Sequence, residues 1–318
     1  MLQFSTDDLR PHERFDHWCE VRAKSLFGVT ISLGREQRPQ FQGRFSAVVI
    51  GSATLADMHA SSYHVSRTWS DIDRMPGDSL CIAEQVRGPG WMDIGKDRVR
   101  QVSNGTIAIS HSDLPFIGTP ARTDGFHYRV LKIPLGNHEI LAASSRHLEP
   151  EPLIGTERLT ALISASFAAV VAQGAALPEA DLAVRHLGQL ALLARGRVTP
   201  GTPESRLALR FGHLQAARRV MTRALHRPDL SPAFVAKALG ISLRQLHMLF
   251  EPSGVSFSRT LSAMRLDKAR QVLTADPMRS VADIAFACGF DSMATFYRAF
   301  RLAYGLSPGD LRAMANHP

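Results

Sequence analysis

Cysteine is scarce in this chain of 318 residues, and its three copies, Cys19, Cys81 and Cys288, lie far apart. Because none of them belongs to a Cys-x-x-Cys pair, neither a zinc finger nor a disulfide framework is indicated. We expect three small buried side chains in a reducing compartment.

The marks of export and of membrane insertion are missing too. The start, MLQFSTDDLRPHERF, carries an acidic pair where a secretory signal has a basic region followed by an apolar stretch. The apolar run at 159–177 is rich in alanine and contains serine, and we do not expect it to span a membrane. These features favour a cytoplasmic protein without membrane association.

Motifs of the common enzyme classes are also missing. The chain has no Gly-x-Ser-x-Gly elbow, no phosphate-binding loop and no Gly-x-Gly-x-x-Gly after a strand. His59 and His64 are five residues apart, and His111 and His127 are isolated, so no histidine spacing indicates a metal site. Cys81 has no histidine partner placed by a motif, which favours a buried strand residue over a nucleophile. The sequence therefore predicts no catalytic residue, no metal and no cofactor.

Acidic residues become scarce only towards the end of the chain. The net charge is +8; residues 1–200 hold 21 Lys and Arg against 21 Asp and Glu, whereas residues 201–318 hold 16 against 8. The whole positive excess belongs to the last part of the chain. A neutral part joined to a basic part predicts that only the second meets a polyanion such as DNA.

The length and this change in charge predict two domains with a linker between them. The segment GRVTPGTPES (196–205) contains two prolines and two glycines, and it interrupts helical patterns on both sides. We place the first domain at residues 1–198, the linker at 199–205 and the basic domain at 206–318.

The sequence of the first domain predicts strands followed by helices. From about Phe41 to Pro134, short apolar runs such as SLCIAEQV (79–86) alternate with turns that contain PGD, GPG and SNG. This pattern is typical of an antiparallel β-barrel or sandwich. The spacing of leucines in LAVRHLGQLALLAR (182–195) predicts a flanking helix, which either seals its own domain or contacts a second copy of the chain.

The second domain is predicted to be helical throughout. Ser231, Ser242 and Ser280 each precede an apolar-periodic stretch, and serine is a favoured N-cap residue. Pro232 supports the same start, because proline is tolerated at the first helical position. We expect helices at residues 206–226, 232–239, 242–251, 256–274, 280–287 and 292–303, and a short one after Pro308.

Two segments of this domain share one plan, FVAKALGISLRQLHMLFE (234–251) and DIAFACGFDSMATFYRAFR (283–301). Each predicts a short helix, a turn at a glycine and a second helix, which is the pattern of a helix-turn-helix unit. A small residue, Ala236 or Ala285, lets the two helices of each unit cross closely. A connecting helix at 256–273, about 27 Å long at the usual rise per residue, predicts that both second helices face one side of a DNA duplex.

The segment from DIAFACGF to FYRAFRLAYGLSPGDLR resembles the C-terminal signature of the AraC/XylS family of bacterial transcriptional regulators, in which Ile-Ala, Gly-Phe, Phe-x-x-x-Phe, Gly-x-Ser-Pro and Leu-Arg follow one another closely. The resemblance covers about residues 206–316. The N-terminal part more loosely resembles the cupin-like effector-binding and dimerisation domain of many members, particularly regulators of aromatic or amine catabolism. The resemblance implies a homodimer that binds promoter DNA, a small-molecule effector and RNA polymerase.

The family position of the two recognition helices implies which residues contact DNA. Arg244 is expected to bond guanine, a contact worth about 1–3 kcal/mol of discrimination. Met293 and Ala294 offer only apolar contact, where many relatives carry polar residues, so Arg298 is the better candidate on the second helix. The expected DNA-binding set is Arg244, Gln245, His247, Met248, Met293, Ala294, Thr295, Arg298, Arg301 and the capping residues Ser242 and Ser292, with Arg259, Arg265 and Lys268 as supplementary phosphate contacts.

A ligand pocket within the first domain is expected to be apolar with a few polar anchors. Aromatic core packing is an equally good account of each candidate. The candidates are Tyr63, His64, Trp69, Trp91, Phe116 and His127.

Together these features predict an α+β protein of two domains: a cupin-like antiparallel β-barrel with flanking helices, and an all-α domain with two helix-turn-helix units joined by a long helix. We expect a sequence-specific DNA-binding transcriptional regulator, an effector-responsive activator, and not an enzyme. Two alternatives stay open at this stage: a constitutive regulator whose first domain only dimerises, and a cupin-type enzyme fused to a DNA-binding domain.

Overall fold

The computed structural model describes residues 1–316 except 22–26, 96–97, 137, 156 and 277. Two compact units divide the chain, Met1–Gly212 and His213–Pro318, and the division lies within helix α6 (Pro203–Arg223). Helix α6 begins inside the segment in which the sequence predicts a linker. It can begin there because the Ser205 amide donates a hydrogen bond to the Thr202 hydroxyl, and because proline is tolerated at the first helical position.

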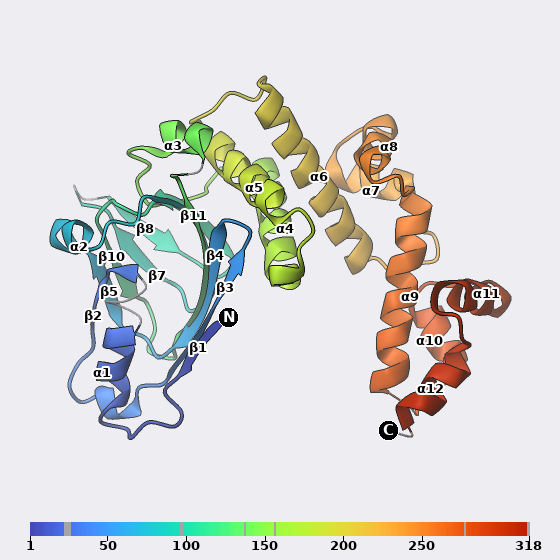
Figure 1. Cartoon of the computed structure of the whole chain (residues 1–318), viewed down its shortest axis with the longest axis horizontal. Helices are drawn as coiled ribbons and strands as arrows, with labels where there is room; N and C mark the ends of the chain where they lie inside the picture. The colour runs from blue at the N-terminus through green and yellow to red at the C-terminus, as the bar shows by residue number, and fades with distance from the viewer. Residues whose placement is uncertain (22–26, 96–97, 137, 156, 277, 317–318) are drawn as a thin grey trace. The chain divides into compact units, whose positions relative to one another are not determined.

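The described strands of the first unit form two antiparallel sheets (Figure 1). The seven-stranded sheet has the order β1-β3-β4-β11-β6-β9-β12, and the five-stranded sheet has the order β2-β5-β10-β7-β8. The strands are β1 (Leu2–Ser5), β2 (Thr30–Ser32), β3 (Gly43–Ile50), β4 (Ala53–Ala60), β5 (His64–Arg67), β6 (Ser79–Arg87), β7 (Gly90–Asp93), β8 (Val99–Val102), β9 (Thr106–His111), β10 (Phe116–Pro120), β11 (Phe126–Pro134) and β12 (Glu151–Pro152).

The two sheets agree with the antiparallel barrel or sandwich that the sequence predicts, but the described strands do not close into a single barrel. Each face of the seven-stranded sheet contributes to a core, since successive side chains of a strand point to opposite sides. On one face, Met58 and Val130 belong to a core that also contains Val65 of the five-stranded sheet. On the other face, Leu55 and Leu131 belong to a core that is completed by helices.

The helices of the first unit close that second core. The leucine-rich helix expected at 182–195 is α5, and its Leu187 and Leu190 are fully buried in the core of their own unit. This stripe therefore seals its own domain and is not a free face for a second copy. The helices are α1 (Arg14–Trp18), α2 (Trp69–Arg74), α3 (Glu139–Ser145), α4 (Glu157–Gln173) and α5 (Ala180–Ala194), with short 3-10 helices η2 (Arg38–Gln40) and η3 (Gly174–Ala176).

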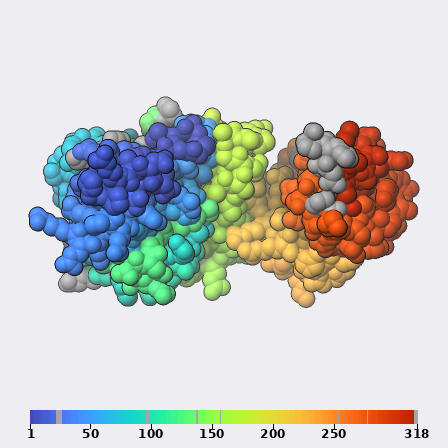
Figure 2. Space-filling view, turned by 90° about the horizontal axis from the view of Figure 1, so that it is seen from below, coloured from blue at the N-terminus to red at the C-terminus, as the bar shows by residue number. Residues whose placement is uncertain are grey.

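Helix α4, continued by η3, is long and apolar enough to cross a membrane when judged by length and composition. The same properties occur in the core helices of folded domains. Ile163, Phe167 and Val170 of α4 are buried in the unit. Of the whole apolar stretch, 33% is buried inside the protein. The yellow-green atoms of this segment reach the surface in Figure 2.

The second unit has the helices that the sequence predicts, with bounds that differ by at most three residues. The agreement follows from local signals, since serine side chains cap α7, α8, α9, α10 and α11. After α6 the helices are α7 (Pro232–Leu239), α8 (Leu243–Phe250), α9 (Phe257–Ala275), α10 (Val281–Ala287), α11 (Met293–Tyr304) and α12 (Pro308–Asn316), with a 3-10 helix η4 (Glu251–Ser253).

Helix α9 runs from the helices α7 and α8 to the helices α10 and α11 (Figure 1) and takes part in two small cores. Near its start, Phe257 and Leu261 pack in a core with residues of α7 and α8. Further along, Leu266 and Leu273 pack in a core with residues of α10 and α11. Each pair of short helices is therefore anchored to its own part of one continuous helix.

Candidate DNA-binding surface and ligand pocket

Both helix pairs of the second unit turn at a glycine in the left-handed conformation. Gly240 after α7 has a φ of 62°, and Gly289 after α10 has a φ of 84°. Ala236 and Ala285, the small residues expected at the helix crossings, are buried. A side chain at Gly289 would place its Cβ 2.3 Å from the carbonyl oxygen of Leu225, so the second turn needs glycine for space as well as for conformation.

Helix α8 is held by a capping box and a buried stripe. The Gln245 amide donates to the Ser242 hydroxyl at 3.1 Å, and the Ser242 amide donates to the Gln245 side chain at 2.9 Å. Leu246 and Phe250 anchor the opposite face in the core. Gln245, which the sequence places among the DNA-reading residues, thus already has a structural role in the cap.

The remaining expected residues of α8 are exposed. Arg244 and His247 lie on the exposed face, and Met248 is 44% exposed beside them. Within the described part of the chain, the side chains of Arg244 and His247 make no hydrogen bond or ion pair. Their donors are therefore available to a partner outside the chain.

Helix α11 repeats the arrangement with a weaker cap. The Thr295 amide donates to the Ser292 hydroxyl at 3.4 Å, and Phe296 and Phe300 are fully buried. The Phe290 ring meets the Phe296 ring edge to face, with centroids 5.0 Å apart, and so closes the turn between the helices. The helix is thus fixed by its aromatic side as the sequence predicts.

The outward face of α11 is more varied than expected. Ala294, Thr295 and Arg298 are exposed, whereas Met293 is half-buried and packs against the core of its own helix pair. Only part of the Met293 side chain is thus exposed, and Arg298 is the charged residue among these four.

The expected phosphate contacts divide into two groups. Arg259, Lys268 and Arg301 are exposed. Arg265 is half-buried, and its guanidinium donates to the Leu225 carbonyl at 3.3 Å and to the Arg227 carbonyl at 2.6 Å. Desolvation lowers the pKa of Arg265. This side chain therefore ties α9 to the segment after α6, which is a structural role that the sequence did not reveal.

A cavity of about 230 Å³ that is partly open to solvent lies between the two sheets of the first unit. Of the six ligand-binding candidates, Tyr63, Trp91 and Phe116 line it. Phe126 and Tyr128 of β11 add further aromatic surface. A small cavity with this lining suits an apolar or aromatic molecule.

The other three candidates, His64, Trp69 and His127, lie outside this cavity. Tyr63 and the residue after His64 face the cavity, and strand alternation therefore turns His64 to solvent, where it is exposed. Trp69 is the first residue of α2 and is 61% exposed. His127 lies between two cavity-lining residues of β11 and so points to the opposite face of the sheet. The ligand-binding candidates that line the cavity are therefore Tyr63, Trp91 and Phe116.

Two cations line the cavity, and they differ in how their donors are used. The buried guanidinium of Arg67 donates to the carbonyl oxygens of Phe27, Gly28, Met75 and Ser112 and to the carboxylate of Asp113. Lys132 lies with its ammonium 5.6 Å from the centre of the Phe27 ring and forms no ion pair within the described residues. Lys132 is thus the cation that a ligand can engage.

Cys81 also lies at the cavity wall, on β6. Burial raises the pKa of its thiol, against a smaller opposing effect of Lys132. The thiol form is therefore favoured, which agrees with the interpretation of Cys81 as a packing residue.

Comparison with known proteins decides the family. A family model described as a helix-turn-helix domain matches residues 235–314. The transcriptional activator NphR of Rhodococcus sp is 34% identical over 322 residues, which cover 97% of this chain and 92% of NphR. The chain belongs to the AraC/XylS family of transcriptional regulators.

Other relatives of this AraC/XylS protein match in part or at lower identity. The regulator GlxA of Rhizobium meliloti (strain 1021) is 36% identical over 113 residues, which cover 35% of this chain and 34% of GlxA. The crystal structure of the AraC-like transcriptional activator CuxR covers 90% of this chain and 100% of its own, with a TM-score of 0.52 and 21% identity. This likeness concerns the fold of both parts of the chain.

Family membership settles the general function. The protein is a DNA-binding transcriptional regulator and not an enzyme. Double-stranded DNA is accordingly a partner, and the protein acts inside the cell, where that DNA is.

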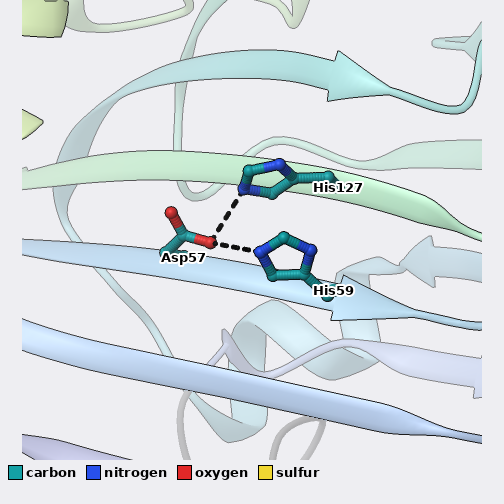
Figure 3. A group of neighbouring side chains, drawn as sticks. All are labelled: Asp57, His59 and His127. Carbon is teal, nitrogen blue, oxygen red and sulfur yellow. Dashed lines mark hydrogen bonds and ion pairs between the residues drawn. The ribbon is translucent and has the colours of Figure 1, made fainter. Parts of the chain in front are cut away.

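A polar cluster lies on the face of the seven-stranded sheet that is turned away from the cavity (Figure 3). The sequence pattern did not predict it. Asp57 and His59 lie on β4, and His127 lies on β11. One carboxylate oxygen, Asp57 Oδ1, lies 2.9 Å from His127 Nε2 and 3.3 Å from His59 Nε2. His64 is the histidine nearest to His59 along the sequence, whereas the strand register places His59 directly opposite His127.

Burial and charge act against each other in this cluster. Desolvation lowers the pKa of His59 and of His127, although the Asp57 carboxylate opposes this effect in both. Burial raises the pKa of Asp57, but Arg129 and His127 outweigh it and hold that pKa below its usual value. Near neutral pH the cluster therefore consists of two neutral imidazoles beside one carboxylate.

Proposed function

We propose that this protein is a sequence-specific, effector-responsive activator of transcription that binds promoter DNA with helices α8 and α11. The observation that carries the proposal is the shared build of the two helices. Each is capped by a serine, buried on one side and exposed on the other, and both belong to the unit that holds the positive excess of the chain. A capped helix with a free polar face is what the major groove admits.

The roles of individual residues follow from their contacts. Arg244 has free donors and is proposed to bond a guanine, with His247 and Met248 beside it on the same face. Thr295 and Arg298 are proposed as the contacts of α11, with Ala294 touching an apolar base edge. Ser242, Ser292, Gln245 and Met293 support their helices, and Arg301, Arg259 and Lys268 are proposed to meet phosphates.

The effector is proposed to occupy the cavity between the two sheets. Its size and its aromatic lining of Tyr63, Trp91 and Phe116 favour a small apolar molecule. Because the donors of Arg67 are engaged by the protein, Lys132 is left to recognise a negative group on that molecule. We therefore propose a small apolar effector that carries an anionic group.

The effector controls transcription, on this proposal, by favouring one arrangement of a homodimer in the cytoplasm. An effector changes the population of two states only when it binds one of them more tightly. The favoured state places the recognition helices on adjacent half-sites and presents the protein to RNA polymerase. NphR is named a transcriptional activator, and activation is the sign of regulation that we propose here.

DNA titration at a series of salt concentrations tests the first part of the proposal. Duplex fragments from upstream of the protein's own gene and its neighbours are compared with random duplex for the wild type and Arg244→Ala. We expect one fragment to be preferred, and we expect the substitution to reduce that preference by about 1–3 kcal/mol. Arg35→Ala, which removes the same charge from an exposed site in the first unit, is expected to keep the preference.

Equal binding to every fragment, unchanged by Arg244→Ala, would contradict the role of α8 in reading sequence.

A thermal-shift series tests the effector separately, with benzoate and octanoate as anionic probes and benzyl alcohol and octanol as neutral ones. A ligand at 100 times its dissociation constant stabilises the native state by about 2.7 kcal/mol. If no probe of either class shifts the transition, the constitutive alternative, in which the first unit has no ligand, is favoured instead.

A further inference from the structure

The cluster of Asp57, His59 and His127 lies on the face of the seven-stranded sheet that is turned away from the effector cavity. We propose that these three side chains form a binding site for one divalent transition-metal ion, such as Zn²⁺ or Ni²⁺. The inference is independent of the proposed effector, because the cavity-lining residues of β4 and β11 alternate with the members of the cluster.

The donor atoms are already close together. One ligand atom from each of Asp57, His59 and His127 lies within 4.8 Å of the others. Both imidazoles turn Nε2 towards the same carboxylate oxygen, as Figure 3 shows. Imidazole nitrogen with a single carboxylate oxygen suits transition-metal ions, whereas Mg²⁺ and Ca²⁺ prefer oxygen ligands throughout.

Strand pairing holds these donors in place. His127 is paired directly opposite His59, and Arg129 directly opposite Asp57, in the antiparallel register of β4 and β11. The four side chains therefore share one face of two hydrogen-bonded strands. A site built on paired strands keeps its geometry better than one built on loops.

A partner outside the three ligands orients the carboxylate. Arg129 donates from Nε to Asp57 Oδ2 at 2.6 Å, so Oδ1 is the oxygen left to face the histidines. Glu84 Oε2 lies 3.6 Å from a terminal nitrogen of Arg129 and helps to hold the guanidinium. Hydrogen-bonded partners of this kind are typical of metal-binding carboxylates and histidines.

The surroundings leave room for the ion but add positive charge. Asp57 and His59 border a surface hollow that is also lined by Arg44, and the positive charges of Arg44, Arg129 and Arg87 act on His59. The two rings stack at a centroid distance of 3.7 Å and an angle of 20°, so they must splay slightly for both nitrogens to point at one ion. Water completes the coordination. The ion then clamps β4 to β11, whose other face lines the cavity.

Metal titration of the full-length protein tests the site. The protein is freed of metal with a chelator, and binding of ZnCl₂, NiCl₂ and MgCl₂ is followed by calorimetry. We expect one equivalent of Zn²⁺ or Ni²⁺ per chain and no Mg²⁺ binding. His59→Ala and His127→Ala are each expected to weaken the binding by tenfold or more, while His64→Ala, at an exposed histidine on β5, is expected to leave it unchanged.

A second variant and a second readout protect the test against misfolding. Asp57→Asn keeps the shape of the side chain and is expected to weaken Zn²⁺ binding with no change in the far-ultraviolet circular dichroism spectrum. Co²⁺ serves as a spectroscopic probe, because its visible absorption reports nitrogen ligation and is expected to be lost in His127→Ala. Absence of Zn²⁺ binding by the wild type, or Zn²⁺ binding that persists in all three cluster variants, would overturn the proposal.

Discussion

Among single residues, Lys132 and Arg67 show that a charged side chain at the cavity wall can bind a ligand only if the protein does not already use its hydrogen-bond donors. Replacing Lys132 by Met removes the ammonium and keeps an unbranched apolar side chain. Because a hydrogen bond to a charged group is worth about 1.5–3 kcal/mol, we expect benzoate or octanoate to bind about 10- to 150-fold more weakly, and the neutral probes to bind as before. Calorimetric titration of both probe classes measures the difference, and equal loss for both would contradict the assigned role.

Asp113 makes the stability of the first unit depend on pH. Burial raises the pKa of its carboxyl, but hydrogen bonds from the amides of Asp78 and Gly77, from Ser112 and from Arg67 outweigh this effect and leave the pKa below its usual value. A lowered folded-state pKa stabilises the unit fully above the unfolded value of about 3.9, and this stabilisation is lost as the pH falls through the folded-state pKa.

Asp113→Asn is therefore expected to destabilise the first unit by about 1–3 kcal/mol at pH 6, since it removes the charge that these donors stabilise. The loss is expected to shrink as the pH is lowered below 4. Urea unfolding followed by tryptophan fluorescence measures it, because Trp18, Trp69 and Trp91 all belong to the first unit. A destabilisation that stays the same from pH 6 to pH 3 would show that the charge of Asp113 is not the cause.

The sequence predicted single residues well where neighbours along the chain decide their environment. Arg244 and Arg298 were placed on exposed helix faces because apolar residues spaced three or four apart from one another, such as Leu246 with Phe250 and Phe296 with Phe300, mark the opposite, buried side. The pairing of His59 with His127 was out of reach, since it depends on the register of two strands about 70 residues apart. The donors of Arg67 were equally invisible, because four of their acceptors are backbone oxygens brought together by folding.

At the scale of elements, the turn between α10 and α11 depends on Gly289. An Ala side chain there would combine a left-handed φ of 84° with a Cβ 2.3 Å from the Leu225 oxygen and 2.8 Å from Arg265 Nε. We expect Gly289→Ala to destabilise the second unit by about 1–3 kcal/mol and to weaken DNA binding through α11. Chemical unfolding followed by far-ultraviolet circular dichroism, which is dominated by helices, measures the first effect.

Gly305→Ala is the matched control for this prediction. Gly305 has a φ of 73° at the end of α11, but no atom of the described residues lies within 4 Å of the position that a Cβ would take. It therefore carries the conformational cost of a left-handed residue without the clash. If Gly305→Ala is as destabilising as Gly289→Ala, the contact with Leu225 and Arg265 is not what makes glycine necessary at the turn.

A helix or strand could be predicted from the sequence where the residues that determine it are neighbours along the chain. The helices of the second unit were placed closely because a serine cap, an apolar repeat and a following glycine all lie within one short segment. In the first unit the sequence predicted short strands between about Phe41 and Pro134 but not how they assemble, since the order of seven and five strands in two sheets depends on pairings between distant segments. Strand β1 (Leu2–Ser5) was not predicted for this reason, because it depends on pairing with the distant strand β3.

For the molecule as a whole, the distribution of charge is the property that joins the two units into one function. The positive excess lies in the part of the chain that holds both helix-turn-helix units, while the part that holds the cavity is neutral. The charge distribution therefore favours attraction of DNA to the second unit and not to the first. Since positive and negative residues balance in residues 1–200, recognition of the proposed anionic effector depends on specific groups such as Lys132.

The salt dependence of DNA binding follows from this distribution. The logarithm of the binding constant falls linearly with the logarithm of the salt concentration, with a slope of about −0.9 for each phosphate that a cation neutralises. We expect Arg301→Ala, at a proposed phosphate contact, to reduce the slope by about 1 on the preferred fragment and on random duplex alike. Arg35→Ala removes one positive charge from the first unit and is expected to leave the slope unchanged, so a loss of slope in that variant would mean that net charge, rather than contact with the duplex, sets the salt dependence.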